Sequence, residues 1–218
     1  MNDFKKEKPN AKNVSVIPLG VSPQFKKNIS PDFISSITMK YSLPKKYFFS
    51  ISSLNPRKNF AHVVKSFIIF IERYQRYDVS LLISGPEGWG DLFNGIDMKK
   101  YEKQIRFTGF IPDEELPVLY RNAVASVYMS LYEGFGLPLL ESIACGTPVI
   151  ASNTSSIPEV IGEAGILLDP YDQNGLAEAY YRILTERGLR EQLLQKSDEI
   201  LKKYTWENFA DVLRDNIL

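Results

Sequence analysis

The sequence predicts an α/β fold built on a doubly wound parallel sheet, and three observations lead to that prediction. Short apolar runs of strand length, such as residues 47–51, 79–84 and 124–129, alternate with longer segments of helical periodicity. The first of these runs is continuously apolar, as in a strand that is covered on both faces. The chain has 218 residues, of which 44% are hydrophobic, and this is enough for one sizeable domain with its own core.

Composition narrows the class of protein. Cys145 is the only cysteine, so no intramolecular disulfide can form, and a reducing, cytoplasmic setting is expected. No apolar run is long enough to span a bilayer, and the lysine-rich N-terminus lacks the apolar stretch of a signal peptide. Residues 1–13 are polar and are predicted to be flexible, so the domain is expected to occupy residues 14–218.

Charge is unevenly distributed, although the net charge is zero. Residues 1–58 carry 11 lysine and arginine side chains against three acidic ones. The favoured interpretation is a solvated segment and domain face. The alternative is peripheral attachment to the anionic inner face of a membrane, or contact with a lipid-phosphate acceptor. Nothing in the chain resembles a nucleic-acid-binding module, and no nucleic-acid partner is expected.

The N-terminal quarter of the chain predicts an entry segment, a helix and a strand. Val14–Val21 is expected to form a short strand and turn. Ser30 suits the cap of a helix over Ser30–Tyr41, because Pro31 then stands at the first helical position, where its missing N–H would be unpaired anyway. Tyr47–Ile51 follows as a strand.

The next helix is predicted to begin after Asn59, whose side chain can cap it. His62, the only histidine, lies off the apolar stripe of this helix and is therefore left out of the candidate site. The stripe consists of Phe60, Val63, Val64, Phe67, Ile68 and Ile71.

Two more strands and a helix are predicted before the centre of the chain. Val79–Ser84 is a strand, and residues 87–98 form a loop at its carboxyl end, the edge where doubly wound sheets bind ligands. Ile105–Ile111 is a strand and turn, and Asp113–Arg121 is a short helix.

The C-terminal third continues the alternation. Pro148–Ala151 and Gly165–Leu168 are predicted strands. Ser156 and Glu159 have the spacing of a capping box, so Glu159 is assigned a structural role. Three helices are predicted near residues 173–186, 188–203 and 206–217, with Thr205 as the cap of the last.

The segment Glu133–Glu141 has the composition of a binding loop that leads into a helix. A strand precedes it, and a helical pattern follows it as far as Gly146. With Pro138 at the first helical position, the N–H groups of Gly134, Phe135 and Gly136 remain free at a helix N-terminus. Such an end attracts anions through its exposed donors and the positive end of the helix dipole.

Glu141 is expected in the first turn of that helix, with its carboxylate near the same site. A carboxylate can accept hydrogen bonds from two neighbouring hydroxyls, so a ligand with a phosphate and a vicinal diol, such as a nucleotide sugar, fits the arrangement. The alternative is that Glu133 and Glu141 are ordinary carboxylates that stabilise the start of a helix.

The run Ser130–Ser152 closely resembles the E-x(7)-E segment of retaining glycosyltransferases, in particular glycosyltransferase family 4, also called glycosyl transferases group 1. The resemblance continues through Ser156–Gly162 and Asp169–Pro170 and covers most of the chain, from about Val16 to Trp206. It implies the GT-B fold of two Rossmann-like domains, of which this chain corresponds to the C-terminal, donor-binding half. It also implies transfer with retention of configuration.

Residues 52–59 resemble the family loop G-R-L-x-P-R-K-N, whose basic residues hold the donor diphosphate. Lys58 matches the family lysine and Arg57 supplies a second cation, whereas Ser52 and Ser53 stand where Gly-Arg is common. A cation opposite a leaving diphosphate is chemically reasonable, because negative charge builds up there in the transition state.

The resemblance assigns roles to individual residues. Glu133, Arg57 and Lys58 are the expected catalytic residues: the carboxylate positions the donor sugar and the cations stabilise the departing diphosphate. No D-x-D motif is present, so neither a metal nor a cofactor other than the nucleotide sugar itself is expected. The expected donor-binding residues are Gly134, Phe135, Gly136, Leu137, Glu141 and, in a segment that lies near the base in the family, Gly109.

The family has an acceptor-binding domain of similar size before the segment that Val14–Val21 resembles, and this sequence lacks it. The chain is therefore expected to be an excised domain, a truncated form or one half of a split enzyme. Its expected partners are a nucleotide-sugar donor and, through the missing domain, a glycan or lipid-linked acceptor in polysaccharide assembly.

Three other functions remain open on sequence grounds. The chain could be a non-catalytic module that binds a nucleotide sugar or completes a separate acceptor domain. The two glutamates also resemble a glycosidase pair, although a glycine loop at a helix start suits a diphosphate better. A dinucleotide-dependent oxidoreductase is a distant third, because no G-x-G-x-x-G follows a strand.

Overall fold

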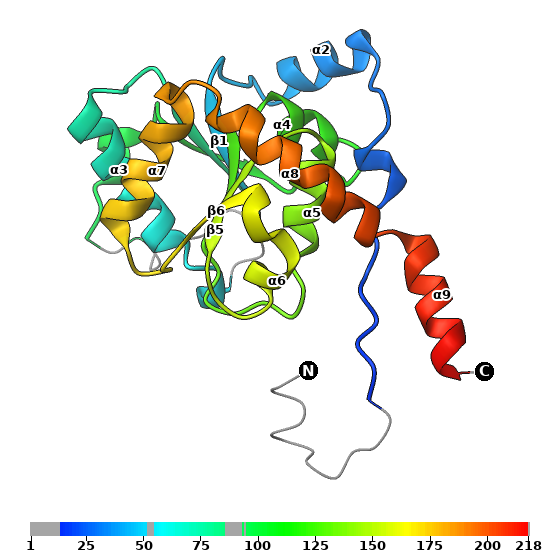
Figure 1. Cartoon of the computed structure of the whole chain (residues 1–218). Coiled ribbons are helices and arrows are strands. Elements are labelled where there is room, and N and C mark those ends of the chain that lie inside the picture. Colours follow the sequence, from blue (N-terminus) through cyan, green and yellow to red (C-terminus); the bar gives the residue numbers. More distant parts are fainter. Residues whose placement is uncertain (1–13, 52–54, 86–92, 94, 218) are drawn as a thin grey trace.

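The computed structural model describes residues 14–51, 55–85, 93 and 95–217. Within these residues, parallel strands form one six-stranded sheet in the order β3-β2-β1-β4-β5-β6 (Figure 1). The sheet grows outward in both directions from the central pair β1 and β4, which is the doubly wound arrangement. The predicted fold class is therefore confirmed. The strands are β1 (Tyr47–Ile51), β2 (Ser80–Ser84), β3 (Ile105–Gly109), β4 (Ala125–Tyr128), β5 (Val149–Ser152) and β6 (Gly165–Leu168).

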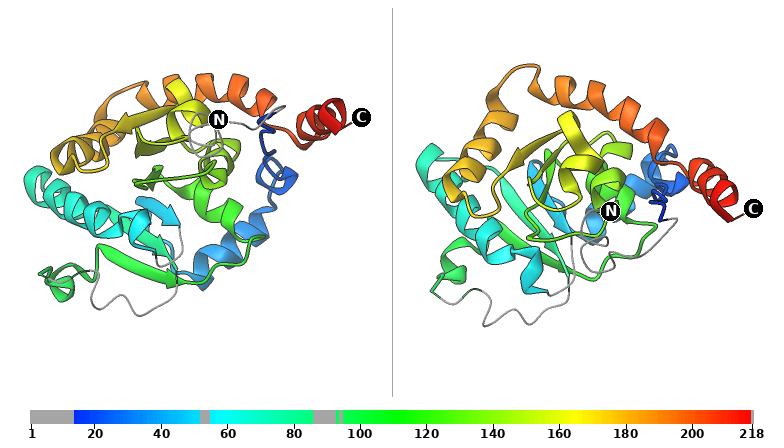
Figure 2. Two further views of the ribbon diagram at one scale, coloured as in Figure 1. Left: turned by 90° about the horizontal axis from the view of Figure 1, so that it is seen from below. Right: turned by 60° about the horizontal axis from the view of Figure 1, so that its bottom comes forward.

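Helices cover both faces of this sheet, as the views in Figure 2 show. On one face lie α3 (Phe60–Tyr74) and α7 (Gln173–Thr185). On the other lie α4 (Leu116–Asn122), α5 (Leu137–Ala144) and α6 (Ile157–Ile161). The remaining helical segments are α2 (Pro31–Lys40), α8 (Leu189–Lys203), α9 (Trp206–Ile217) and the short 3₁₀ turns η1 (Pro23–Phe25), η2 (Pro56–Lys58), η3 (Met98–Tyr101) and η4 (Gly162–Ala164).

Two hydrophobic clusters form because successive side chains of a strand point to opposite faces. Phe48 points to the α3 side, where its ring centroid lies 4.5 Å from that of Tyr180. Phe49 points to the α4 side and packs edge-on against Tyr120, with the ring centroids 5.2 Å apart. The predicted apolar stripe of α3 is buried against the first cluster, except that Ile68 is only partly buried.

Several predicted helix starts are confirmed in detail. The Ser30 hydroxyl accepts the Phe33 N–H at 3.3 Å, and Pro31 is the first residue of α2. The Thr205 hydroxyl likewise accepts the Asn208 N–H at 3.1 Å. These bonds satisfy N–H groups that have no partner inside the helix.

The predicted strand at Val14–Val21 is wrong. Residues 14–22 form no strand, and the Val21 N–H donates instead to the Tyr204 carbonyl at 3.1 Å, between α8 and α9. Gly20 packs so closely on this junction that an added Cβ would lie 2.3 Å from the Trp206 nitrogen. The segment has strand-like residues, but it lies against helix ends and not beside a strand edge.

The entry segment and α9 occupy the same corner of the domain. Figure 1 shows α9 extending away from the sheet with the N-terminal segment beside it. The Ser15 hydroxyl donates to the Asn216 side-chain oxygen, and Trp206 is 42% exposed. None of the helices in the described part of the chain combines the length and apolar character needed to cross a membrane.

Cys145 ends α5 and is buried against η1. Its Sγ lies 3.4 Å from the Phe25 carbonyl oxygen, to which the thiol donates. Burial raises the pKa of this thiol to about 12.

Three predictions concern residues outside those described. These are the flexible segment 1–13, the loop positions Ser52 and Ser53, and most of the loop 87–98.

We expect Gly20→Ala to destabilise the domain. The new methyl group would meet backbone atoms of Thr205 and Trp206 at 2.3–2.8 Å, and backbone cannot rotate aside as a flexible side chain can. Overpacking of this kind lowers the free energy of unfolding by about 1–3 kcal/mol, which urea denaturation would measure. Gly134→Ala is the matched control, because an added Cβ there has nothing within 4 Å. Equal stability of the two variants would contradict the packing of Gly20 on this junction.

Candidate functional site

The candidate site lies where the order of the sheet reverses, between β1 and β4. Because all strands are parallel, their carboxyl ends share one edge, and the loops after β1 and β4 leave it on the two sides of this switch point. Doubly wound sheets bind ligands in the crevice that such loops form. The loop after β1 contains η2, and the loop after β4 leads into α5.

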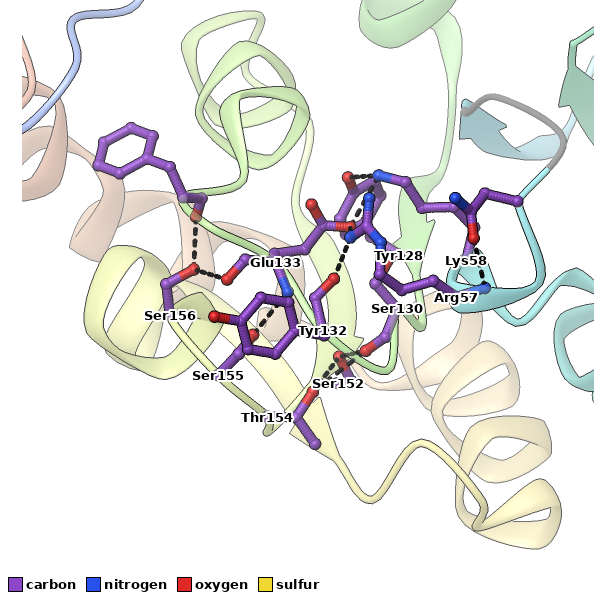
Figure 3. A network of polar contacts seen from close by, with 12 residues as sticks. Arg57, Lys58, Tyr128, Ser130, Tyr132, Glu133, Ser152, Thr154, Ser155 and Ser156 are labelled. Atoms are coloured by element: carbon purple, nitrogen blue, oxygen red, sulfur yellow. Dashed lines mark hydrogen bonds and ion pairs between the residues drawn. The ribbon is translucent and has the colours of Figure 1, made fainter. Parts of the chain in front are cut away.

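A carboxylate and two cations meet at this switch point, as Figure 3 shows. Glu133 Oε1 lies 2.7 Å from Lys58 Nζ and 2.8 Å from Arg57 Nη1. The side chains of Glu133 and Lys58 are only 9% and 11% exposed, whereas Arg57 is 37% exposed. The structure therefore brings together the three residues that were predicted to be catalytic, although 75 positions separate Lys58 from Glu133 in the chain.

Electrostatics keep this cluster charged. Burial alone would raise the pKa of Glu133, but hydrogen bonds to Lys58 and Arg57 outweigh it, and the pKa of Glu133 lies below its usual value. Lys58 Nζ also donates to the Tyr128 hydroxyl and lies 4.7 Å from the centre of that ring. Burial and the nearby Glu133 raise the pKa of Tyr128, so the phenol stays neutral. Two cations and one anion leave the cluster with an excess positive charge.

Backbone contacts hold the cationic loop in place. The Asn55 side chain accepts the Arg57 N–H at 2.9 Å, and the Arg57 carbonyl accepts the Leu131 N–H at 2.8 Å. The Arg57 guanidinium donates to the Tyr132 carbonyl oxygen. The loop after β1 is thus tied directly to the loop after β4.

Asn59 differs from its prediction. It precedes α3 as expected, but its side chain makes no capping bond and instead donates to the Pro170 carbonyl at 2.8 Å. Its φ of 57° lies in the left-handed region, which asparagine tolerates better than most residues. The side chain therefore joins the η2 loop to the loop after β6.

The start of α5 presents unused backbone donors. The helix begins at Leu137, so Pro138 is the second residue and not the first as predicted. Gly136 precedes it with a φ of 105°, a conformation that favours glycine. Among the described hydrogen bonds, none uses the N–H groups of Gly134, Phe135, Gly136 or Leu137. In the part of the chain that the structure describes, four backbone donors at and just before the start of α5 thus have no hydrogen-bond partner.

Hydroxyl side chains of the loop after β5 hold the backbone of this motif (Figure 3). The Ser155 hydroxyl accepts the Glu133 N–H at 2.8 Å. The Ser156 hydroxyl shares its single proton between the Glu133 carbonyl at 2.9 Å and the Phe135 carbonyl at 3.1 Å. The predicted capping box is wrong, because the Ser156 side chain makes these bonds and none to α6.

The sequence analysis did not predict the role of this set of hydroxyl side chains. Ser152, the last residue of β5, and Thr154, Ser155 and Ser156, in the loop that follows it, lie at the carboxyl edge of the sheet. That position was the available signal. Ser152 and Thr154 contribute as well, since both hydroxyls donate to the Ser130 carbonyl, at 2.5 and 3.1 Å.

Glu141 lies apart from the cation cluster in the described contacts. It stands in the second turn of α5 and not in the first as predicted. Tyr120 donates to its Oε2 at 3.2 Å, and no described hydrogen bond or ion pair joins it to Arg57, Lys58 or Glu133. Burial raises its pKa to about 7; the Tyr120 bond lowers it and the charge of Asp113 raises it.

Gly109 ends β3 at the same edge of the sheet. Its φ is 70°, and its carbonyl accepts the Gly85 N–H at 3.0 Å and the Ser84 hydroxyl at 3.3 Å. A Cβ at this position would have nothing within 4 Å. The residue therefore leaves open space two strands away from β1.

No group of three or more His, Cys, Asp or Glu side chains within the described ranges is placed to hold one metal ion. The absence of a metal requirement stays a prediction.

Comparison with known proteins gives concordant results. The family model described as glycosyl transferases group 1 matches residues 39–199. An O-antigen chain mannosyltransferase B of Escherichia coli is 37% identical over 183 residues, 82% of this chain and 48% of that protein. A serotype-specific mannosyltransferase of the same species is 32% identical over 184 residues, 83% of this chain and 23% of that protein. The chain thus spans about half or less of the length of these relatives.

Solved structures support the fold. The sucrose-phosphate synthase of Thermosynechococcus elongatus superposes with a TM-score of 0.79 at 24% identity, over 98% of this chain and 55% of that one. The N-terminal domain of a Candida albicans trehalose-6-phosphate phosphatase gives 0.77 at 17% identity, over 95% and 51%.

The raised pKa of Glu141 predicts a stability that falls with pH. Between pH 4.5 and about 7, the folded state holds a proton that the unfolded state has released, so the free energy of unfolding decreases across this window. Glu141→Gln stays neutral and should escape this loss, gaining about 2.5 kcal/mol on the wild type between pH 5 and pH 8. Urea denaturation at both pH values measures the difference. Glu114→Gln, which removes an exposed carboxylate, is the control. Parallel pH profiles for wild type and Glu141→Gln would refute the shift.

Proposed function

The chain belongs to the glycosyl transferases group 1 family, and on that premise we propose that it is the donor-binding half of a retaining glycosyltransferase. The reaction is transfer of a hexose from a nucleotide diphosphate sugar to a glycan or lipid-linked acceptor. The observation that carries this proposal is the cluster of Arg57, Lys58 and Glu133 at the switch point of the sheet.

A diphosphate suits the charge of this cluster. Arg57 and Lys58 together exceed the charge of Glu133 by one, and unused N–H groups at the start of α5 add neutral donors. Cations and helix N-termini both stabilise phosphate oxygens. Because negative charge grows on the leaving diphosphate in the transition state, the same groups lower the barrier to its departure.

Glu133 has a second role in this proposal. Its carboxylate forms ion pairs with both cations, each within 2.8 Å. A bound diphosphate offers Arg57 and Lys58 another anion, which frees the carboxylate to accept hydrogen bonds from hydroxyls of the donor sugar. The anomeric carbon is then held between the carboxylate and the leaving group.

Glu141 is assigned to the ribose diol, and Gly109 to the neighbourhood of the base. Accepting from both ribose hydroxyls requires the ionised carboxylate, whereas the pKa of about 7 keeps much of Glu141 protonated in the free protein at neutral pH. Donor binding should therefore release a proton and tighten as pH rises from 6 to 8.

Mannose is the transferred hexose that the relatives suggest, because the names of the Escherichia coli proteins specify mannosyltransferases. O-antigen assembly is the corresponding class of glycan synthesis. The acceptor is assigned to the part of the relatives that this chain does not match, since it spans 48% of the first of them. We assign the reaction to the cytoplasm. The lysine and arginine side chains of residues 1–58 are the candidates for peripheral contact with a membrane.

The alternative is a non-catalytic module that binds a nucleotide sugar or completes a separate acceptor domain. The test measures consumption of GDP-mannose or UDP-glucose by the 218-residue chain, alone and with the acceptor half of a relative added. Donor binding without turnover in either assay would support the non-catalytic module. Turnover by the chain alone would contradict the half-enzyme proposal, whereas turnover only after the acceptor half of a relative is added would support it.

We expect Lys58→Met to weaken binding of UDP or GDP at least tenfold, because a charge-assisted hydrogen bond to the diphosphate is lost. Isothermal titration calorimetry measures this change. Lys45→Met is the matched control: it removes the same charge from an exposed residue just before β1, at the opposite edge of the sheet. Equal losses in both variants would reduce the role of Lys58 to long-range attraction, and no binding of either nucleotide to the wild type would contradict donor binding.

A further inference from the structure

Two adjacent serines hold the Glu133 residue by its backbone, from both of its peptide groups. Ser155 accepts the Glu133 N–H at 2.8 Å. The single Ser156 hydroxyl proton is shared between the Glu133 carbonyl at 2.9 Å and the Phe135 carbonyl at 3.1 Å, as a bifurcated hydrogen bond. In Figure 3 these serines lie on one side of Glu133, and Arg57 and Lys58 lie on the other. The backbone that carries the Glu133 carboxylate is thus fixed on the side opposite the two cations.

Peptide geometry extends the effect of Ser156 to two further groups. In a planar trans peptide, the C=O of one residue and the N–H of the next point in opposite directions. Turning the Glu133 carbonyl toward Ser156 therefore turns the Gly134 N–H away from it. The Phe135 carbonyl does the same for the Gly136 N–H. Both N–H groups are among the donors that no described hydrogen bond uses.

We propose that Ser156, assisted by Ser155, is a positioning residue that aims the Gly134 and Gly136 N–H groups at the donor diphosphate or sugar and fixes the backbone of Glu133 beside the two cations. This inference rests on the proposed donor-binding function. In this role Ser156 does not contact the ligand itself but acts by orienting the backbone of residues 133–136.

A purely local role for these serines does not account for their geometry. Ser156 stands at the N-cap of α6 but makes no side-chain bond to that helix, which has only five residues. Ser155 has a φ of 52°, in the left-handed region that residues other than glycine rarely adopt. Ser155 therefore adopts a backbone conformation that is unfavourable for serine, and its hydroxyl accepts the Glu133 N–H.

The test compares Ser156→Ala with Ser156→Thr in the full chain, using calorimetric titration with UDP and GDP. The alanine variant should bind the diphosphates about tenfold more weakly, as expected when donors to a charged group lose their alignment. The threonine variant keeps the hydroxyl and should recover affinity to within about twofold. The affinity for UMP and GMP, which lack the second phosphate, should fall less in Ser156→Ala than the affinity for UDP and GDP. The matched control is Ser36→Ala, which removes a hydroxyl bond to the Phe33 carbonyl on the distant α2 and should change nothing.

Ser155→Gly gives an independent test, because stability and binding should move in opposite directions. Glycine adopts a φ of 52° without strain, so the thermal midpoint should stay the same or rise. Loss of the hydroxyl that holds the Glu133 N–H should nevertheless weaken diphosphate binding several-fold. A merely structural serine would show no such opposition.

The outcomes separate this inference from the proposed function. Wild-type binding with unchanged affinity in Ser156→Ala would overturn the positioning role and leave donor binding intact. Lower stability and lower affinity in Ser156→Ala that the threonine variant does not restore would also overturn it. Failure of the wild type to bind either UDP or GDP would instead refute donor binding, and this inference with it.

Discussion

The pairing of one buried carboxylate with two cations is the constraint on which the site depends. Glu133 comes from the loop after β4, and Arg57 and Lys58 come from the loop after β1, so their ion pairs join the two central strands at their carboxyl ends. A carboxylate buried without partners would be strongly destabilising. The pairing therefore favours an arrangement of the two loops that brings all three charges together, and that arrangement leaves an excess positive charge beside unused backbone donors.

The loops around this cluster are fixed mainly by polar contacts to backbone. The Asn55 side chain accepts the Arg57 N–H at 2.9 Å, and the Asn59 side chain donates to the Pro170 carbonyl at 2.8 Å. Hydroxyls from the loop after β5 do the same for the motif before α5. Apolar packing adds one anchor, the Phe135 ring, which meets Tyr204 edge-on with the centroids 5.4 Å apart. Such a site is built from short polar side chains that mutually restrict one another, and so it keeps its shape on a loop framework.

The sequence predicted best what depends on local pattern. The strand Tyr47–Ile51 and the stripe of α3 follow from periodic apolar residues, because burial acts on each element directly. The errors concern contacts between distant segments. Asn59 and Ser156 stand at cap positions, but their side chains bond to distant carbonyls, and a residue that can cap a helix can equally serve such an acceptor.

Two other features of the site lay beyond the reach of pattern. The turn that Glu141 occupies depends on the first residue of α5, and a shift of one residue turns a helical side chain by about 100°. The meeting of Lys58 with Glu133 was predicted through family resemblance alone, since no periodicity relates residues 75 positions apart. Val14–Val21 shows the converse: its residues suit a strand, but the fold offers them a helix junction.

The buried thiol of Cys145 can report local opening of the fold through its rate of alkylation. Thiols react as thiolates, and a pKa of about 12 leaves roughly one thiolate in ten thousand at pH 8. The sulfur is also enclosed between the end of α5 and η1. Alkylation therefore requires these segments to separate, so its rate reports how often the C-terminal end of α5 opens, and the other end of this helix follows the Glu133–Gly136 loop. Because Cys145 is the only cysteine in the chain, the measured alkylation rate refers to this site alone.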